Sequence, residues 1–500
     1  MKYSIILIIT LLSFSLSAQQ YDGDRILSVE EVKKDFAFYR DLLENTHAGL
    51  YRFNNKELMT ARLDSLESTF TTDLTSIDYY WALTHFSATI RCAHSFVLPV
   101  ENFISYIQYG ISTFPFYMYP LQGKLYVLFN GSEDLQIEPG YELVSINGLS
   151  TSQIIDKIFT HYWSDGYNDS GKLQSLEGLL FSAFYYLFVD RSKKFDLVFK
   201  NQEGKTVKTS VAPQTFNETN RKFSKNPVNQ STLKAYKGSA SKSWEYKVLK
   251  DVENTAHVVI TGFGHKDVND SEAAAQKMRD FMNEMLRKLE KKNIDNLILD
   301  LRSNSGGWDA MAVELFSYLS KSGRPIRFYN KNFTMTNDPE YLKYSDLAKE
   351  DYEDVLDELI PLENGMFRLK EKDYDNLKEM SPKENRYKGD LYILIDHNTG
   401  SAAVEFAAIA KSEKTGIMVG EESGGAYEGA NGGSFITMKL PESGFYIRIP
   451  LVTGDMNVRS VEDKGRGVIP DHIVPFTVED LISRNDRQLN FVKDLIRNKK

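Results

Sequence analysis

Two segments of this chain each carry an apolar run into a turn of small residues and then into a helical pattern; they span residues 296–308 and 391–408. The first turn contains Gly306 and Gly307, whose backbone can be approached closely because glycine has no Cβ. The second turn places the hydroxyl of Ser401 directly before a helix start, where free amides and the helix dipole favour a developing anion. A nucleophile and an oxyanion-binding turn are the minimum equipment for acyl transfer.

The composition is that of a globular protein with more than one domain. The chain has 500 residues, of which 42% are apolar and 26% are charged, and both fractions are ordinary for folded proteins. A single hydrophobic core rarely organises a chain of this length, so about three domains are expected. The formal net charge of -9 leaves no basic footprint, so we expect no nucleic-acid partner.

The N-terminus has the pattern of a secretory signal peptide. Lys2 precedes an apolar run over residues 5–14, and residues 15–18 supply the small side chains of a cleavage site. We therefore predict a signal peptide over residues 1–18, a mature chain that begins near Ala18 or Gln19, and a periplasmic or secreted protein. The apolar run is too short to cross a bilayer comfortably, so no stable membrane span is expected after cleavage. A retained membrane anchor is the alternative.

Residues 19–100 predict a small helical domain. Apolar residues recur three and four positions apart, and Ser28 with Glu31 forms a capping box for the first helix. The helical pattern gives way to an extended segment at residues 91–97. This segment contains Cys92, the single cysteine of the chain, so an internal disulfide is impossible.

Residues 101–215 have short β-like runs separated by turns. Within them, residues 137–148 and the helical pattern of residues 151–158 resemble part of a PDZ domain. PDZ domains add an extended peptide to a sheet edge and capture its terminal carboxylate. A generic β-hairpin with an Asn-Gly turn is the alternative. The polar residues 216–244 then predict an interdomain linker or a mobile loop.

Residues 245–480 predict an α/β domain. Near-continuous apolar strands alternate with helices, which is typical of a buried, largely parallel sheet. Strands are expected at residues 257–263, 296–301 and 391–395, and a long helix at residues 271–291. A charged, tyrosine-rich insertion over residues 331–388 separates the last two strands, and residues 481–500 predict a C-terminal surface helix.

Four short phrases in the second half of the chain carry a resemblance to a known family: Leu299–Gly307, Gly400–Ala403, Val419–Gly425 and Gly467–Asp471. In type, order and spacing they resemble the catalytic domain of the S41 peptidases, the tail-specific or C-terminal processing proteases and their tricorn-like relatives. The resemblance implies a multidomain α/β fold with a helical N-terminal domain, a PDZ-like β-rich domain and a crotonase-like (ClpP/crotonase) catalytic domain.

The resemblance also assigns roles to residues of the site. It implies that Ser401 is the nucleophile and that backbone N–H groups of Gly306, Gly307 and Ala402 form the oxyanion hole. A serine in a Gly/Ala-rich turn is otherwise an ordinary helix cap, and Gly-Gly after a strand is otherwise an ordinary turn.

A serine hydroxyl needs a base to become nucleophilic at neutral pH. Lysine-type members of the family have a lysine at the position that aligns with Ala426, so this chain lacks it. Tricorn-like members use a histidine in a phrase similar to Asp-x-His-Ser, and His94 occupies that place here, with Cys92 where the relatives tend to have an acid. A histidine has an ordinary pKa near 6.5, which suits a general base. His397 and His265 are the competing candidates.

A carboxylate could orient the base. Tricorn-like enzymes carry a glutamate shortly before the Gly-x-x-Pro-Asp phrase, and Glu462 is the nearest match; a surface glutamate is the alternative. Glu405 follows the serine at a helical offset, where it would support the helix start. The chain contains no metal-binding, Walker or G-x-G-x-x-G phrase, so neither a metal nor a cofactor is expected.

These features predict a secreted or periplasmic serine peptidase of the S41 type, an endopeptidase or C-terminal processing peptidase that acts on a peptide or protein substrate. Two alternatives remain: a catalytically inactive S41-fold protein that binds peptides or hydrophobic ligands, and a non-peptidase acyl hydrolase with the same nucleophile. The residues indicate neither a cleavage preference nor an oligomeric state.

Overall fold

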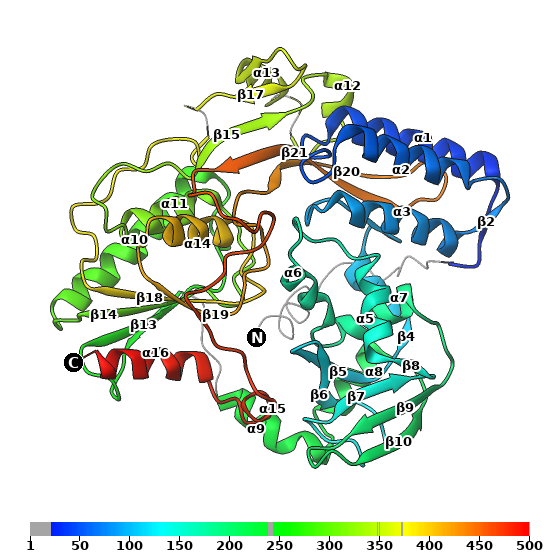
Figure 1. The fold of residues 1–500 in the computed structure, drawn as a ribbon, viewed down its shortest axis with the longest axis horizontal. Helices are drawn as coiled ribbons and strands as arrows, with labels where there is room; N and C mark the ends of the chain where they lie inside the picture. Colours follow the sequence, from blue (N-terminus) through cyan, green and yellow to red (C-terminus); the bar gives the residue numbers. More distant parts are fainter. Residues whose placement is uncertain (1–21, 239–243, 348, 350, 372–373, 500) are drawn as a thin grey trace.

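The computed structural model describes residues 22–238, 244–347, 349, 351–371 and 374–499. The predicted signal peptide, residues 1–18, lies outside the described residues. Figure 1 shows a multidomain α/β arrangement: blue helices at the upper right, a cyan β-rich part below them, and an α/β part on the left. No helix among the described residues is long and apolar enough to cross a membrane.

The N-terminal part is helical, as the sequence predicts. Its helices are α1 (Val29–Thr46), α2 (Lys56–Ser68) and α3 (Ser76–Ile90), with a short ladder of β1 (Ile26–Leu27) and β2 (Leu74–Thr75). The predicted capping box of α1 is present. The Glu31 N–H donates to Ser28 Oγ at 3.3 Å, and the Ser28 N–H donates to Glu31 Oε2 at 2.7 Å.

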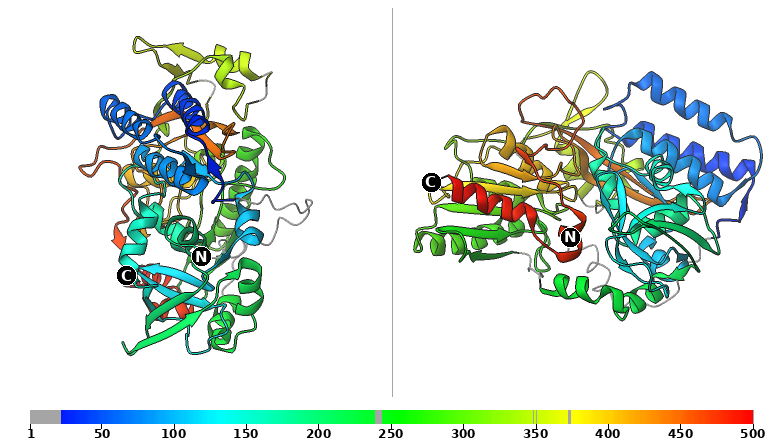
Figure 2. Two further views of the ribbon diagram at one scale, coloured as in Figure 1. Left: turned by 90° about the vertical axis from the view of Figure 1, so that its right-hand side faces the viewer. Right: turned by 60° about the horizontal axis from the view of Figure 1, so that its bottom comes forward.

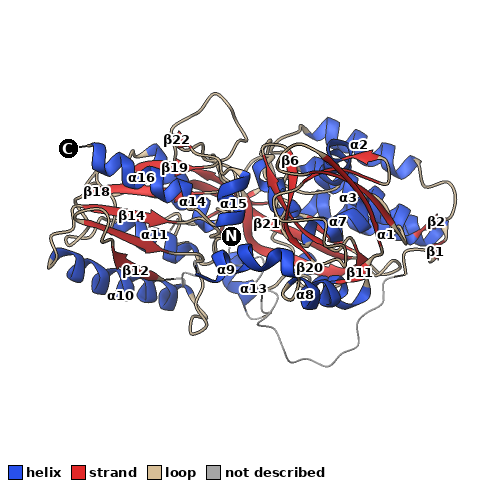
Figure 3. Cartoon of the chain, turned by 90° about the horizontal axis from the view of Figure 1, so that it is seen from below, coloured by secondary structure: helices blue, strands red, loops and turns tan. Residues whose placement is uncertain are grey.

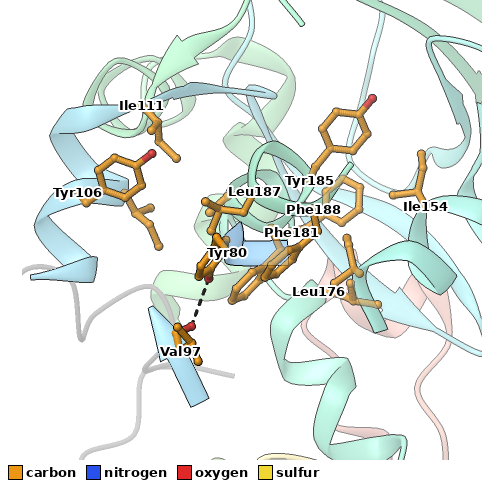
Figure 4. Close-up of a cluster of buried hydrophobic side chains, with 14 of the residues drawn as sticks. Tyr80, Val97, Tyr106, Ile111, Ile154, Leu176, Phe181, Tyr185, Leu187 and Phe188 are labelled. Atoms are coloured by element: carbon orange, nitrogen blue, oxygen red, sulfur yellow. Dashed lines mark hydrogen bonds between the residues drawn. The ribbon is translucent and has the colours of Figure 1, made fainter. Parts of the chain in front are cut away.

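A cluster of buried aromatic side chains joins the helical part to the β-rich part (Figure 4). Tyr80 on α3 stacks against Phe188 with ring centroids 5.9 Å apart, and its hydroxyl donates to Val97 O at 3.3 Å. Phe188 in turn stacks on Phe184, with ring centroids 5.6 Å apart. Because aromatic rings bury large apolar areas, this shared core fixes how the two parts pack.

The β-rich part is a six-stranded antiparallel sheet with the order β10-β9-β7-β6-β5, in which β8 pairs with β7. Asn147 (φ 50°) and Gly148 (φ 83°) both adopt left-handed backbone at the β7–β8 hairpin, the conformation that a tight two-residue turn requires. The elements are β4 (Ser112–Thr113), β5 (Phe116–Leu121), β6 (Lys124–Asn130), β7 (Glu142–Ile146), β8 (Leu149–Ser150), β9 (Phe195–Lys200), β10 (Thr206–Val211), β11 (Gln214–Thr215), α4 (Phe103–Ser105), α5 (Thr151–Phe159), α6 (Ser170–Leu173) and α7 (Leu180–Phe188).

The segment that composition assigns to a linker is largely helical. It contains α8 (Phe216–Phe223) and α9 (Gln230–Gly238), and residues 239–243 lie outside the described residues. Thr215 and Glu218 form a capping box at the start of α8, which gives this polar sequence a defined helix start. Helix α9 lies against α15 (Val478–Ser483) near the C-terminus.

The predicted parallel sheet is confirmed. Its order is β12-β13-β14-β18-β19-β22, with every neighbour pair parallel except β12 with β13. Side chains alternate between two cores: Leu297 and Leu299 face one, and Ile298 faces the other. Both faces are therefore covered by helices, which explains the continuous apolar strands.

Helices α10 (Ser271–Glu290), α11 (Asp309–Ser317) and α14 (Ala402–Ser412) cover one face of this sheet, and α16 (Arg487–Asn498) covers the other (Figure 1). Figure 3, seen from below, shows strands β12, β14, β18 and β19 side by side. The strands are β12 (Glu245–Val248), β13 (Thr255–Val259), β14 (Asn296–Asp300), β18 (Asp390–Ile395), β19 (Ile417–Gly420) and β22 (His472–Ile473).

A second sheet, which the sequence did not predict, has the order β16-β17-β15-β21-β20, and the N-terminal strand β3 pairs with β21. The insertion after residue 328 supplies three of these strands, together with α12 (Pro339–Leu342) and α13 (Asp351–Asp357). The other strands are β3 (Phe96–Leu98), β15 (Tyr329–Thr334), β16 (Leu359–Pro361), β17 (Phe367–Leu369), β20 (Asn431–Lys439) and β21 (Tyr446–Met456). Figure 2 shows the orange strands β20 and β21 beside the blue N-terminal helices.

Candidate active site

Ser401 stands at the sharp turn between strand β18 and helix α14. Its backbone has φ 48° and ψ −131°, a conformation that is costly for a residue with a Cβ and that recurs at functional turns. The side chain makes no capping hydrogen bond to the helix. The Ser401 hydroxyl therefore lies at the N-terminus of α14 but does not cap the helix.

The Ser401 turn is tied to the Gly306–Gly307 turn by hydrogen bonds. The Gly400 N–H donates to Asn304 O at 3.0 Å, and the Ser303 N–H donates to Asp396 Oδ1 at 3.0 Å. Strands β14 and β18 are parallel neighbours, so the turns that follow them meet at one edge of the sheet. A Cβ placed on Gly306 would lie 2.5 Å from the Cβ of Ser401, which shows how close the two turns are.

Two of the three predicted oxyanion donors remain available. The Gly306 N–H donates to Asn304 Oδ1 at 2.9 Å and is therefore occupied, so the prediction for this donor needs correction. Within the described part of the chain, the N–H groups of Gly307 and Ala402 have no hydrogen-bond partner. Gly307 has φ 132°, and a Cβ there would lie 2.1 Å from Phe263 O. This position accordingly requires glycine.

A cavity of about 790 Å³ opens in front of Ser401. The Gly307 turn and the start of α14 form one side of it, and strands β15, β20 and β21 of the second sheet form another. The insertion contributes further lining residues, among them Leu342, Leu359 and Leu369. A volume of this size is in the range of small-molecule and peptide-binding clefts.

His94 lines the same cavity as Ser401, although the two residues belong to distant parts of the chain. Strand β3 begins two residues after His94 and pairs with β21, with Phe96 opposite Arg448. The imidazole ring stacks on Phe435 of β20, with ring centroids 5.7 Å apart. No hydrogen bond joins His94 to Ser401 among the described residues, and His94 Nδ1 is buried without a partner. Catalytic hydrogen bonds often form only once substrate is bound.

Asp165 is the carboxylate that the structure places beside His94. Asp165 Oδ1 accepts the N–H of Ala93 at 2.8 Å, so it anchors the segment that carries the histidine. Burial lowers the pKa of His94, and the guanidinium of Arg448 adds to the lowering, while the charge of Asp165 opposes it. The ring is therefore neutral at neutral pH, the state that a general base needs. Cys92, next to this segment, is buried with its pKa raised to about 12 by burial, and so remains a thiol.

The competing histidines lie elsewhere. His397 is buried, and its Nε2 lies 2.6 Å from Glu177 Oε1. Although burial opposes its charge, Glu177 raises the pKa of His397 to about 9. His397 is thus a cation at neutral pH and cannot accept the serine proton. His265 lies 3.2 Å from Asp267 and outside the cavity lining.

The predicted carboxylate partner Glu462 is not at the site. It is exposed in the loop before Gly465 and does not line the cavity. Glu462 was predicted from its position shortly before the Gly-x-x-Pro-Asp phrase, but in this loop its side chain is exposed to solvent. Ala426, where lysine-type relatives have their base, does line the cavity with a methyl group.

Comparison with known proteins agrees with this geometry. The family model of Peptidase family S41 matches residues 254–474. Residues 254–474 are therefore similar to an S41 peptidase domain. The match contains the Gly306–Gly307 turn and Ser401 but not His94, which belongs to the N-terminal part of the chain.

Two solved structures, both of mature CPAF, share the fold over 94% of this chain. Mature CPAF superposes with a TM-score of 0.62 at 15% identity, covering 94% of this chain and 98% of that chain. Mature CPAF complexed with lactacystin gives 0.63 at 15% identity, covering 94% and 99%. The photosystem II D1 C-terminal processing protease gives 0.41 at 12% identity, covering 89% and 93%.

Sequence reasoning missed two groups of the site. Asp165 lies in an irregular segment between α5 and α6, and no motif marks it. Asn304 holds the oxyanion turn through both its carbonyl and its side chain. This role could have been predicted from the sequence, because Asn304 lies two residues before Gly306. An asparagine side chain commonly accepts a hydrogen bond from the backbone N–H two residues later.

We expect Gly306→Ala to abolish turnover and covalent labelling of Ser401. The new Cβ would meet the Ser401 Cβ at 2.5 Å, on a backbone with φ 101° that disfavours alanine. Displacing the nucleophile and the Gly307 donor together should lower kcat/KM by at least about 100-fold. Fluorophosphonate labelling and peptide turnover measure the effect. Gly204→Ala is the matched control, because Gly204 has φ 79° with nothing within 4 Å. Equal activity in the two variants would contradict the assignment.

Proposed function

We propose that this chain is a serine peptidase in which Ser401 attacks a peptide carbonyl and His94 is the general base. The observation that carries the proposal is that Ser401, Gly307 and His94 line one cavity. The Ser401 hydroxyl makes no capping hydrogen bond, and the N–H groups of Gly307 and of Ala402, the residue after Ser401, have no partner among the described residues. These are the nucleophile, electrophilic donors and base of acyl transfer.

The reaction follows from these positions. His94 takes the proton of the Ser401 hydroxyl as its oxygen attacks the carbonyl carbon. The N–H groups of Gly307 and Ala402 bind the oxyanion of the tetrahedral intermediate. The imidazolium then gives its proton to the leaving amine, and water releases the acyl group in a second cycle with the same base. Asp165 favours the imidazolium through its charge, which stabilises the ring while it holds the proton.

Other parts of the assignment rest on sequence patterns and general architecture. The β-rich part has the hairpin and helix expected of a PDZ-like domain, and the parallel sheet with its nucleophile at a strand-to-helix turn fits a crotonase-like domain. The N-terminal pattern supports export to the periplasm or beyond, which N-terminal sequencing of the exported protein would check.

Ser401→Ala and His94→Ala should each lower turnover of a cleaved peptide by about 1,000-fold or more, because nucleophile and base act as one unit. The double variant should be hardly worse than either single variant. Ala426→Ser is the control and should remain active, since the position contributes no base.

Two outcomes would redirect the proposal. Full activity in His94→Ala would move the base to another residue. Wild-type protein that neither cleaves a broad peptide panel nor labels at Ser401 would identify a silent binding protein, whereas turnover of esters without peptides would identify a different acyl hydrolase.

The pH dependence should carry the signature of His94. Activity requires the neutral ring, so kcat/KM is low below the pKa of His94 and rises as pH increases through it. Because burial lowers this pKa, the acid limb should lie below about pH 6.5. In Asp165→Asn the limb should move to lower pH, since the charge that favours the imidazolium is gone. A limb near pH 9 or above would indicate an amine base instead.

The PDZ-like part should recruit a substrate through its terminal carboxylate. Amidation of the C-terminus of a cleaved peptide should then raise KM with little change in kcat. The same peptide acetylated at its N-terminus is the control, because its carboxylate is intact. Equal KM for the amidated and free peptides would contradict recruitment and leave the peptidase assignment in place.

A further inference from the structure

Three carboxyl groups line the cavity in front of Ser401. Helices α11 and α14 begin side by side, and each places a carboxyl group on the cavity: Asp309 in the first turn of α11 and Glu405 one turn after Ser401. Glu358, at the start of β16, adds a third carboxyl group. Among the described residues that line the cavity there is no lysine or arginine, and His94 is the only basic side chain.

Two acceptors in this cavity have no donor. The Tyr329 hydroxyl donates to Glu405 Oε1 at 2.8 Å, but Glu405 Oε2 is buried without a partner in the described structure. Asn332 is 5% exposed; its Nδ2 donates to Asn376 Oδ1 at 3.4 Å, while its Oδ1 also lacks a donor. Buried polar atoms are normally hydrogen-bonded. Both oxygen atoms can accept N–H donors from a bound group.

Lysine and arginine are the side chains that match this demand. An ammonium has three donors and a guanidinium five, and neither has an acceptor. The charge of either would also compensate the carboxyl groups, whose ionised form is costly when buried. The position suits a substrate residue, because Glu405 lies on the same helix face as Ser401, one turn away.

Burial and neighbouring negative charge raise the pKa of the carboxyl groups in this cavity, so a cation bound beside them would favour their ionised form. Burial, with help from the charge of Asp309, raises the pKa of Glu405 well above its ordinary value. Burial and the charge of Asp375 raise the pKa of Asp309 to about 6. The guanidinium of Arg52 acts on nearby Tyr329 and lowers the pKa of that hydroxyl, but less than burial and Glu405 raise it.

We propose that this acidic cavity binds a lysine or arginine side chain next to the scissile bond, so that the chain cleaves beside basic residues. The proposal rests on the peptidase function proposed above. It commits to a cationic side chain of the substrate and to Glu405 as the main specificity-determining residue, with Asp309 and Asn332 as further acceptors.

The test compares two peptides that differ only by lysine or norleucine beside the scissile bond, with cleavage positions mapped by mass spectrometry. The wild-type full chain should prefer the lysine peptide by about 10- to 100-fold in kcat/KM, the range expected for hydrogen bonds to a charged group. Glu405→Gln should bring this ratio close to one. Glu413→Gln is the matched control: Glu413 ends the same helix and pairs with Arg324 on the surface, so the ratio should stay at the wild-type value.

A measurement on the wild-type protein needs no variant. KM for the lysine peptide should fall as pH rises, because ionised carboxyl groups bind the cation more tightly, whereas KM for the norleucine peptide should not follow this trend. Cleavage of both peptides at equal rates, or an equal loss for both in Glu405→Gln, would overturn the specificity proposal alone. Absence of hydrolysis of either peptide, with no labelling of Ser401, would overturn the peptidase function and this proposal with it.

Discussion

The pairing of β3 with β21 is the contact on which the candidate site depends. Strand β3 belongs to the N-terminal part of the chain, and its register on β21 sets Phe96 opposite Arg448, which brings His94 to the cavity of Ser401. Arg52 strengthens the docking, since it donates to Gly454 O at 2.8 Å and to Glu428 O at 3.2 Å. The part of the chain that matches the S41 family therefore contains Ser401 and the Gly306–Gly307 turn, and the N-terminal part adds His94.

Local pattern predicted the part of the site that lies within one sheet. Local pattern singled out the turns at Gly306 and Ser401, and the structure brings them together because they follow adjacent parallel strands. His94 could be proposed only through family resemblance, because its distance from Ser401 depends on docking between domains. Glu462 was placed by its offset in the chain, and the loop around it leaves the side chain in solvent. Asp165 lies beside the segment that carries His94, and no sequence motif predicts this position.

The fold, too, was predicted only in part: the parallel sheet was predicted, and the second sheet was not. The continuous apolar strands predicted the parallel sheet because both of its faces are buried under helices. The polar insertion gave no such signal, yet it forms strands β15, β16 and β17. These strands are short and half-exposed. Strand β15 pairs with β21, β17 pairs with β15, and β16 pairs with β17, so their conformation depends on neighbouring strands more than on intrinsic preference. The side of the cavity that the insertion forms is therefore the part of the site that is hardest to predict from the sequence.

Burial has opposite consequences for the two kinds of titratable group in this cavity. Removing water disfavours charge, so it lowers the pKa of His94 and raises the pKa of Glu405. The first effect favours a neutral His94, the form that the proposed base needs. The second leaves carboxyl groups whose ionisation a bound cation would favour, because charges interact more strongly away from bulk water. Burial thus supports both proposals for this cavity: proton transfer by His94 and discrimination of substrates by charge.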